Sequence, residues 1–219
     1  MHPVVEREQL SPNVVRLVVE APRIAKVRRP GQFVIVRKGP GAERIPLTIA
    51  DNDPEAGTIT LMIQAIGVST TELTSLQVGE TIQDVAGPLG RETDLIPSGH
   101  AVCVGGGVGT AVLLPIVKAL SEKGVHVTSV IGGRSREWVI LEPELRACGD
   151  VVVQGGGGDV GRVPLEDVSD ASVWRVPPLV SVERDNPRGV ELDPRPLCQR
   201  RHLAGLVVGR VRIIDHRHR

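Results

Sequence analysis

Several features that mark particular protein classes are scarce in this chain of 219 residues. It has only three cysteines, at positions 103, 148 and 198, and no two of them form a CxxC pair. This spacing excludes a disulfide framework and favours a reducing compartment. No apolar run approaches the roughly 18 residues of a membrane span, and the N-terminus lacks the apolar region of a secretory signal. We therefore expect a cytoplasmic protein with no membrane span.

The sequence also lacks an excess of charge of either sign. Lys and Arg together number 26, as do Asp and Glu, and no basic run stands out. Charge therefore gives no reason to expect a nucleic acid or an anionic membrane as a partner. Paired carboxylates, a Ser/His/Asp arrangement and metal-ligand spacing of the histidines are also missing. The sequence assigns no catalytic side chain and no metal ligand.

Residues 1–98 have the pattern of an antiparallel β-barrel. Short β-branched segments are separated by clusters of Pro, Gly, Asn and Asp; they cover residues 13–20, 32–37, 58–64 and 81–86. Several short strands at this spacing are typical of a closed or nearly closed barrel.

Residues 99–154 change to an alternation of strands and helices. The expected order is a strand at 101–104, a helix at 111–120, a strand at 125–131, a helix at 140–148 and a strand at 150–153. This order predicts an open parallel α/β sheet. Pro115 lies inside the first helix and should kink it or belong to its first turn, and Gly124 is expected to end it.

Residues 155–219 differ in composition from the rest. They contain eleven Arg, six Pro and no Lys, and begin with a run of four Gly. Such a segment has little apolar surface to offset chain entropy. We expect an atypical, poorly ordered tail, which is either a divergent end or the product of a shifted reading frame.

The strongest candidate binding motif lies between the first α/β strand and its helix. Its sequence is VGGGVGTA over residues 104–111. Glycines let the backbone approach a phosphate, and a helix N-terminus offers N–H groups with a positive dipole end. The alternative is a tight strand–helix turn with no ligand. The candidate residues are Gly105, Gly106, Gly107, Gly109 and Thr110.

Three weaker motifs have two interpretations each. Arg44 with Pro46 and Thr48 could hold a phosphate and a planar ring, or form an exposed Arg before an ordinary strand. The turn at 67–71 could give donors to a pyrophosphate, or cap a helix. Residues 132–136 (GGRSR) could read an adenosine ribose, or form a solvated loop. Arg134 and Arg136, with no acidic residue at 131–136, would favour a ribose that carries a 2′-phosphate.

Taken in order, these motifs resemble the ferredoxin–NADP⁺ reductase superfamily. Within it the likeness is to the small FAD/NAD-binding subunits of NADH-dependent ferredoxin:NADP⁺ oxidoreductases, also described as sulfide dehydrogenases, and to dihydroorotate dehydrogenase electron-transfer subunits. The resemblance covers about residues 1–153. The segments that carry it are PGQF at 30–33, RIPLTIAD at 44–51, QAIGVST at 64–70, GPLG at 87–90, residues 105–111, IGGRS at 131–135 and VILEPELR at 139–146.

The resemblance implies a flavin-dependent oxidoreductase subunit. In such proteins a Greek-key barrel binds FAD; here Arg44, Pro46, Leu47 and Thr48 would hold its phosphate and isoalloxazine. Gly67, Ser69 and Thr70 would hold the pyrophosphate. The second domain would bind NAD(P)H, with residues 105–110 at its pyrophosphate and Arg134 and Ser135 near its ribose. Hydride would pass between NAD(P)H and FAD, and electrons would go on to a larger flavin/iron–sulfur subunit or a ferredoxin-type acceptor.

Two departures from the family pattern are visible. The usual C-terminal cysteine motif for a [2Fe-2S] cluster is missing, since only Cys198 lies beyond residue 148. The second nicotinamide-side segment, a strand that ends in Gly-Pro before a helix, is also missing after Val153. The alternative function is therefore a degenerate, non-catalytic flavin-binding or assembly subunit.

Overall fold

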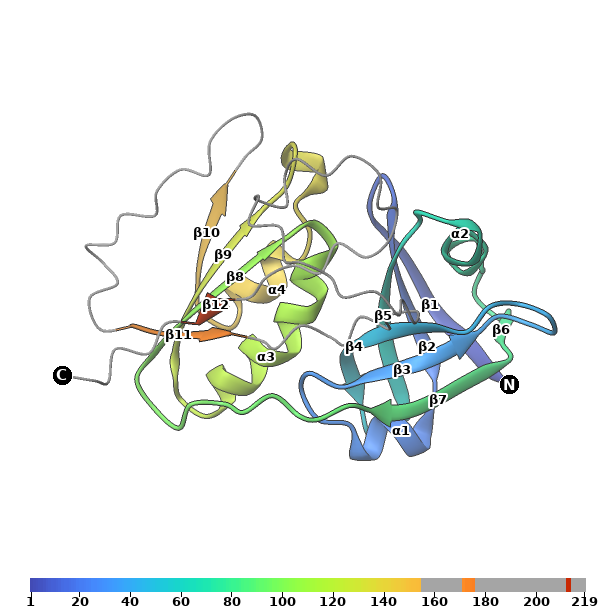
Figure 1. Ribbon diagram of the computed structural model, residues 1–219, viewed down its shortest axis with the longest axis horizontal. Coiled ribbons are helices and arrows are strands. Elements are labelled where there is room, and N and C mark those ends of the chain that lie inside the picture. Colours follow the sequence, from blue (N-terminus) through green and yellow to red (C-terminus); the bar gives the residue numbers. More distant parts are fainter. Residues whose placement is uncertain (155–170, 176–211, 214–219) are drawn as a thin grey trace, which may run out of the picture. The chain divides into compact units, whose positions relative to one another are not determined.

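The computed structural model describes residues 1–154, 171–175 and 212–213 (Figure 1). All of these belong to one compact unit of the chain. The tail expected at 155–219 lies outside the described residues, apart from two short strands. Cys198 also lies outside them.

The N-terminal part is an antiparallel sheet of seven strands that curls into a nearly closed barrel. The strand order is β6-β1-β2-β5-β4-β3-β7. The two outermost strands, β6 and β7, are separated in the chain by Gln83 alone, which brings the open edges together. The expected barrel is confirmed. Its strands are β1 (His2–Ser11), β2 (Val14–Glu20), β3 (Phe33–Arg37), β4 (Ile45–Asp53), β5 (Thr58–Gln64), β6 (Thr81–Ile82) and β7 (Asp84–Leu89).

The barrel has apolar residues on both faces of its central strands. On β5, Ile59, Leu61 and Ile63 are fully buried in the core of the barrel, because alternate residues of a strand share a face. Met62, which points the other way, belongs instead to the apolar cluster that includes α3. The barrel wall at β5 is therefore covered from outside.

The structure adds elements that the sequence pattern did not reveal. Strand β1 is rich in charged residues, and the short helix α1 (Pro22–Val27) follows β2 directly. The segment 81–86, predicted as one strand, is two strands because β6 pairs with β1 whereas β7 pairs with β3. The helix α2 (Val68–Thr74) begins at the predicted turn.

The C-terminal part contains the expected parallel sheet. Strands β8 (His100–Gly106), β9 (His126–Gly132) and β10 (Asp150–Gln154) are parallel neighbours. The structure adds β11 (Ala171–Arg175), parallel to β8 on its other side, and β12 (Arg212–Ile213), antiparallel to β11. The helices α3 (Thr110–Glu122) and α4 (Glu142–Arg146) contact each other and pack on the sheet (Figure 1).

Helix α3 is buried on more than one side. It contacts β8 and β9 of the sheet and also β4 of the barrel. This is why its sequence is apolar around most of its circumference. The helix runs through Pro115 and ends where expected, with Gly124 in the left-handed region at φ +77°. Within the part of the chain described here, no helix is long and apolar enough to cross a membrane.

Candidate functional site

The segment that begins with Arg44 forms the start of β4. Arg44 is exposed and directly precedes the strand, and it has no ion pair with any described residue. Residues 45–48 pair with β3, whereas β5 pairs with β4 only from Ile49 onward. The other edge of 45–48 therefore has no strand partner among the described residues. This open edge also explains how Pro46 fits within a strand.

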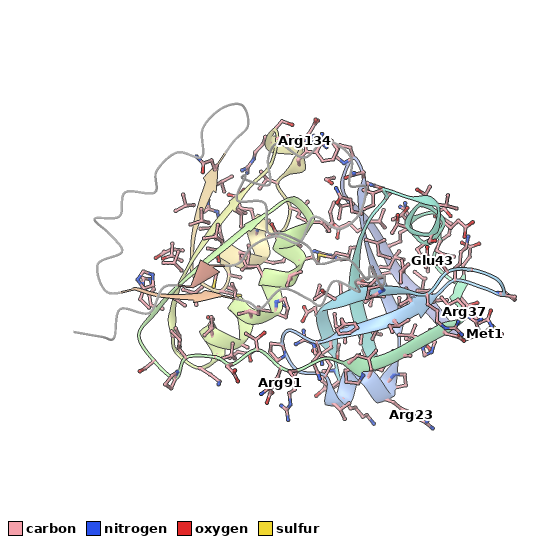
Figure 2. All side chains as sticks on the ribbon, viewed as in Figure 1. Met1, Arg23, Arg37, Glu43, Arg91 and Arg134 are labelled. Carbon is pink, nitrogen blue, oxygen red and sulfur yellow. The ribbon has the colours of Figure 1, made fainter. Side chains whose placement is uncertain are left out.

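A hydrogen bond joins this segment to the first turn of α2. The hydroxyl of Ser69 donates to the carboxylate of Glu43 over 2.8 Å, across 26 positions of sequence. Figure 2 shows Glu43 beside α2. The structure thus brings together Arg44 and the 67–70 turn, which the sequence had only placed in order along the chain. Glu43 was not identified from the sequence, because its link to Ser69 depends on how the barrel closes.

The turn itself is capped by its own threonine. The hydroxyl oxygen of Thr70 accepts the N–H groups of Ile66 at 3.1 Å and Gly67 at 3.0 Å. The helix-cap interpretation is therefore correct for Thr70. Gly67 is exposed, and a Cβ at this position would meet no atom within 4 Å. The turn is open on its outer side.

Two further motif segments meet next to Thr48. Phe33 pairs with Thr48 on one side and with Leu89 on the other. The Gln32 side chain donates to the carbonyl of Gly90 at 3.0 Å. A Cβ on Gly90 would lie 3.0 Å from the Phe33 ring, so glycine is required for this close approach. The 30–33 and 87–90 segments thus form one end of the barrel wall.

A hollow in the barrel lies at the other end of β3, where the strand leads into the turn before β4. Its volume is about 530 Å³, and it lies between the β3–β4 turn, α2 and the turn before β6. None of the sequence-predicted site residues lines it. The lining residues are Lys38, Gly39, Pro40, Ala42, Glu72, Leu76, Gly79, Glu80 and Thr81.

The glycine-rich motif is the turn from β8 into α3. Gly107 begins a short 3₁₀ turn with φ +53°, and a Cβ there would meet nothing within 4 Å. A Cβ on Gly105 would lie 3.4 Å from both Leu113 and Thr110, so Gly105 allows α3 to pack closely on β8. The loop therefore combines tight internal packing with an open outer side.

Two residues of this motif have structural tasks. Thr110 is 1% exposed, and its N–H bonds to the carbonyl of Gly107. Its backbone N–H therefore stabilises the start of α3. Gly109 is buried as well, whereas Gly106 is exposed at the end of β8. Gly106 and Gly107 are the positions where a ligand could approach the backbone.

The loop after β9 carries the two arginines of the predicted ribose site. The guanidinium of Arg134 lies 4.3 Å from the centroid of the Trp138 ring, a cation–π contact that leaves the side chain exposed (Figure 2). Ser135 donates to Glu137 at 3.3 Å.

Arg136 differs from Arg134 because it is ion-paired. Its guanidinium lies 2.6 Å from the Glu142 carboxylate, which also binds Arg146 at 2.7 Å. The hydrogen bond from Arg146 and the contacts with Arg136 lower the pKa of Glu142. Only Arg134 of the two arginines is therefore free to meet an anionic ligand.

Three titratable side chains lie together at the amino ends of β8, β9 and β10, the end of the sheet opposite the glycine-rich loop. The rings of His100 and His126 are 4.4 Å apart, and His126 bonds to Asp150 at 2.9 Å. Burial first, and then the neighbouring His126, lower the pKa of His100, although Asp150 opposes the shift. Within the described ranges, no group of three His, Cys, Asp or Glu side chains is arranged to hold a metal ion.

The two cysteines in the described residues do not fit an iron–sulfur cluster. Cys103 is buried in β8, and burial raises the pKa of its thiol to about 12. Burial also raises the pKa of Cys148. Cluster ligands are thiolates, so both environments oppose that role.

Comparison with known proteins gives a consistent match for the N-terminal part. Residues 1–93 match the oxidoreductase FAD-binding domain family. A curated relative from Thermotoga maritima, a "dihydroorotate dehydrogenase B (NAD(+)), electron transfer subunit homolog", is 38% identical over 161 residues. The match covers 74% of this chain and 57% of the relative. A second relative, the dihydroorotate dehydrogenase B (NAD(+)) electron transfer subunit of a Geobacillus strain, is 36% identical over 169 residues. This match covers 73% of this chain and 65% of the relative.

Solved structures show the same fold. The structure of an NADH-dependent reduced ferredoxin-NADP oxidoreductase matches with a TM-score of 0.69 and 35% identity, covering 77% of this chain and 61% of that chain. A ferredoxin reductase of carbazole 1,9a-dioxygenase matches with a TM-score of 0.63 at 18% identity, which shows the fold alone. The chain thus spans about six-tenths of the length of these relatives.

Proposed function

We propose that this chain, whose residues 1–93 match the oxidoreductase FAD-binding domain family, transfers hydride between NAD(P)H and FAD. In this proposal residues 1–98 bind FAD, residues 99–154 bind the nicotinamide nucleotide, and the chain works as an electron-transfer subunit. The observation that carries the proposal is the Ser69–Glu43 hydrogen bond, because it joins the two segments that are proposed to hold the flavin.

The residues present fit the phosphates of FAD. The first N–H groups of a helix have no acceptor within that helix, and the exposed turn at Gly67 leaves room in front of them. Arg44 supplies an exposed guanidinium without an ion pair, which suits a charge-assisted contact. Glu43 is exposed, so its carboxylate can turn away from an entering phosphate.

The strand that follows Arg44 would orient the flavin ring. The edge of 45–48 that lacks a strand partner has backbone groups available for a planar, hydrogen-bonding ring, and Leu47 and Thr48 are only half-buried. When bound, FAD supplies the hydride-accepting and electron-releasing chemistry. The protein's task is to hold the ring and exclude water from it.

The nucleotide is proposed to bind at the carboxyl ends of β8 and β9. Gly106 and Gly132 are paired neighbours at these strand ends, where open α/β sheets bind ligands. The outer side of Gly107 is open to a pyrophosphate, and Arg134 is free for the ribose end.

The partner is also part of the proposal. The relatives are named as electron-transfer subunits, and this chain spans only part of their length. We propose a larger flavin or iron–sulfur oxidoreductase subunit as the partner, with a ferredoxin-type protein as a possible acceptor.

Anaerobic mixing of the FAD-loaded protein with NADH or NADPH tests the proposal. We expect the flavin absorbance to bleach with at least one nucleotide, because the nucleotide loop and the flavin motifs are both present. The measurement is stopped-flow absorbance at limiting nucleotide. A protein that retains FAD but is bleached by neither nucleotide would be the non-catalytic flavin-binding subunit instead.

A second prediction concerns the choice between NADPH and NADH. Arg136 is engaged by Glu142, so the Glu142→Gln change should release it toward a 2′-phosphate. The Arg136 side chain of this pair is 71% exposed, so the pair has a small energy, and we expect the NADPH-to-NADH rate ratio to rise about two- to fivefold. The matched control is Glu137→Gln, a nearby carboxylate with no arginine partner in the described residues. An unchanged ratio in Glu142→Gln would remove Arg136 from the ribose site.

A further inference from the structure

An ion pair connects the barrel to the helix that follows the nucleotide loop. The ammonium of Lys118, on α3, contacts the carboxylate of Asp51, near the end of β4. Both side chains are about one-third exposed, at 35% each. The pair therefore lies partly shielded from water, and its members come from elements 67 positions apart in the chain.

Asp51 also has contacts within the barrel that fix its position. The Arg28 guanidinium, only 7% exposed, lies 3.9 Å from its second carboxylate oxygen. The next residue, Asn52, donates to the carbonyl of Ala25 at 2.7 Å and so fastens β4 to α1. Lys118 thus contacts an anchored carboxylate and not a mobile surface group.

Apolar contacts surround this ion pair. Ala50 and Met62 of the barrel belong to the same buried cluster as Val117 and Leu120 of α3. Apolar packing is non-directional, so it can hold α3 against β4 without defining the register between them. An ion pair with a fixed partner defines the register between α3 and β4.

The Lys118–Asp51 ion pair lies on two elements that each begin at a proposed binding segment. β4 begins with the flavin-binding residues, and Asp51 lies three residues after Thr48, about 10 Å along the strand. α3 begins at the nucleotide loop, and Lys118 lies eight residues after Thr110, about 12 Å along the helix. One contact therefore connects the two elements whose first residues are proposed to hold the two reactants.

We propose that Lys118 and Asp51 are positioning residues that set the nicotinamide loop relative to the flavin. This inference rests on the proposed function. Hydride transfer needs the reacting atoms about 3–3.5 Å apart, and a displacement of about 1 Å can cost on the order of a hundredfold in rate. Neither side chain touches FAD or the nucleotide in this arrangement.

Flavin reduction in matched variants tests the proposal. Lys118→Met and Asp51→Asn should each lower the limiting reduction rate about tenfold at saturating nucleotide. FAD retention and the nucleotide concentration for half-maximal rate should stay as in the wild type. Lys118→Arg keeps the charge and should restore most of the rate. The control is Arg37→Met, which breaks the partly exposed Arg37–Asp84 ion pair between β3 and β7 and should leave the limiting reduction rate unchanged.

A second readout needs neither flavin nor nucleotide. Amide hydrogen exchange in the FAD-free protein reports local opening of α3. Exchange across residues 110–122 should be faster in Lys118→Met and Asp51→Asn than in the wild type or in Arg37→Met. The Asp51→Asn variant serves if Lys118→Met does not fold.

The outcomes separate this inference from the proposed function. If the wild type is reduced and both variants match it in limiting rate, the positioning role is wrong and the proposed function stands. If the wild type is not reduced by either nucleotide, the proposed function fails. In that case, hydrogen exchange across α3 that is the same in the variants and the wild type overturns the positioning role as well. Faster exchange in the variants supports the role of the Lys118–Asp51 ion pair in holding α3 on β4.

Discussion

Replacing Arg44 with Ala should lower the affinity for FAD about tenfold to a hundredfold. The side chain is exposed, without an ion pair in the described residues and adjacent to Glu43, which accepts a hydrogen bond from the first turn of α2. A hydrogen bond to a charged phosphate contributes about 1.5–3 kcal/mol, and its loss gives this range of affinity. The measurement is the apparent Kd for FAD, from fluorescence titration of the flavin-free protein.

Arg23→Ala is the matched control for this prediction. Arg23 is another exposed arginine of the barrel, on α1, with no ion pair in the described residues (Figure 2). Its removal should leave the Kd for FAD unchanged. If Arg44→Ala also binds FAD like the wild type, the assignment of the 44–48 segment to the flavin phosphate is wrong.

Replacing Gly107 with Val should reduce the use of the nucleotide and leave FAD binding intact. Gly107 has φ +53°, a conformation that costs a β-branched residue about 1–2 kcal/mol or more. The new side chain would also fill the open outer side of the loop. We expect the nucleotide concentration for half-maximal flavin reduction to rise about tenfold to a hundredfold.

Gly124→Val provides a control with the same backbone strain at the other end of α3. Gly124 has φ +77°, and a Cβ there also meets nothing within 4 Å. Both variants should lose similar thermal stability, but only Gly107→Val should weaken nucleotide use. Equal nucleotide dependence in the two variants would mean that the loop is merely a strand–helix turn.

The local patterns of the sequence predicted most of the elements. Alternating β-branched residues placed β2, β3 and β5 to within a residue or two, and the apolar run of α3 was recognised with its glycine stop. These signals are readable because each depends on neighbours a few positions away. Strand β1 was missed because six of its ten residues are polar or charged, which hides a strand that is only partly buried.

Strand pairing across the barrel determined the strand boundaries and long-range contacts that local sequence patterns could not predict. The split of 81–86 into two strands follows from β6 and β7 having different partners. The same closure brings Glu43 to Ser69. Likewise, the prediction that Arg134 and Arg136 act together was limited by Glu142, which lies six positions after Arg136 and reaches it only through the bend before α4.

By itself, then, the sequence determined the class of fold and located the glycine-rich and arginine-containing motifs, because glycine spacing and hydrophobic alternation are local properties. Tertiary structure decided which groups in these motifs have partners within the fold. It paired Arg136 with Glu142 and the Thr110 backbone N–H with Gly107, left Arg44 and Arg134 without an ion pair in the described residues, and joined Lys118 to Asp51. The physical reason is that ion pairs and hydrogen bonds between distant residues depend on strand register and helix packing, which only the folded chain defines.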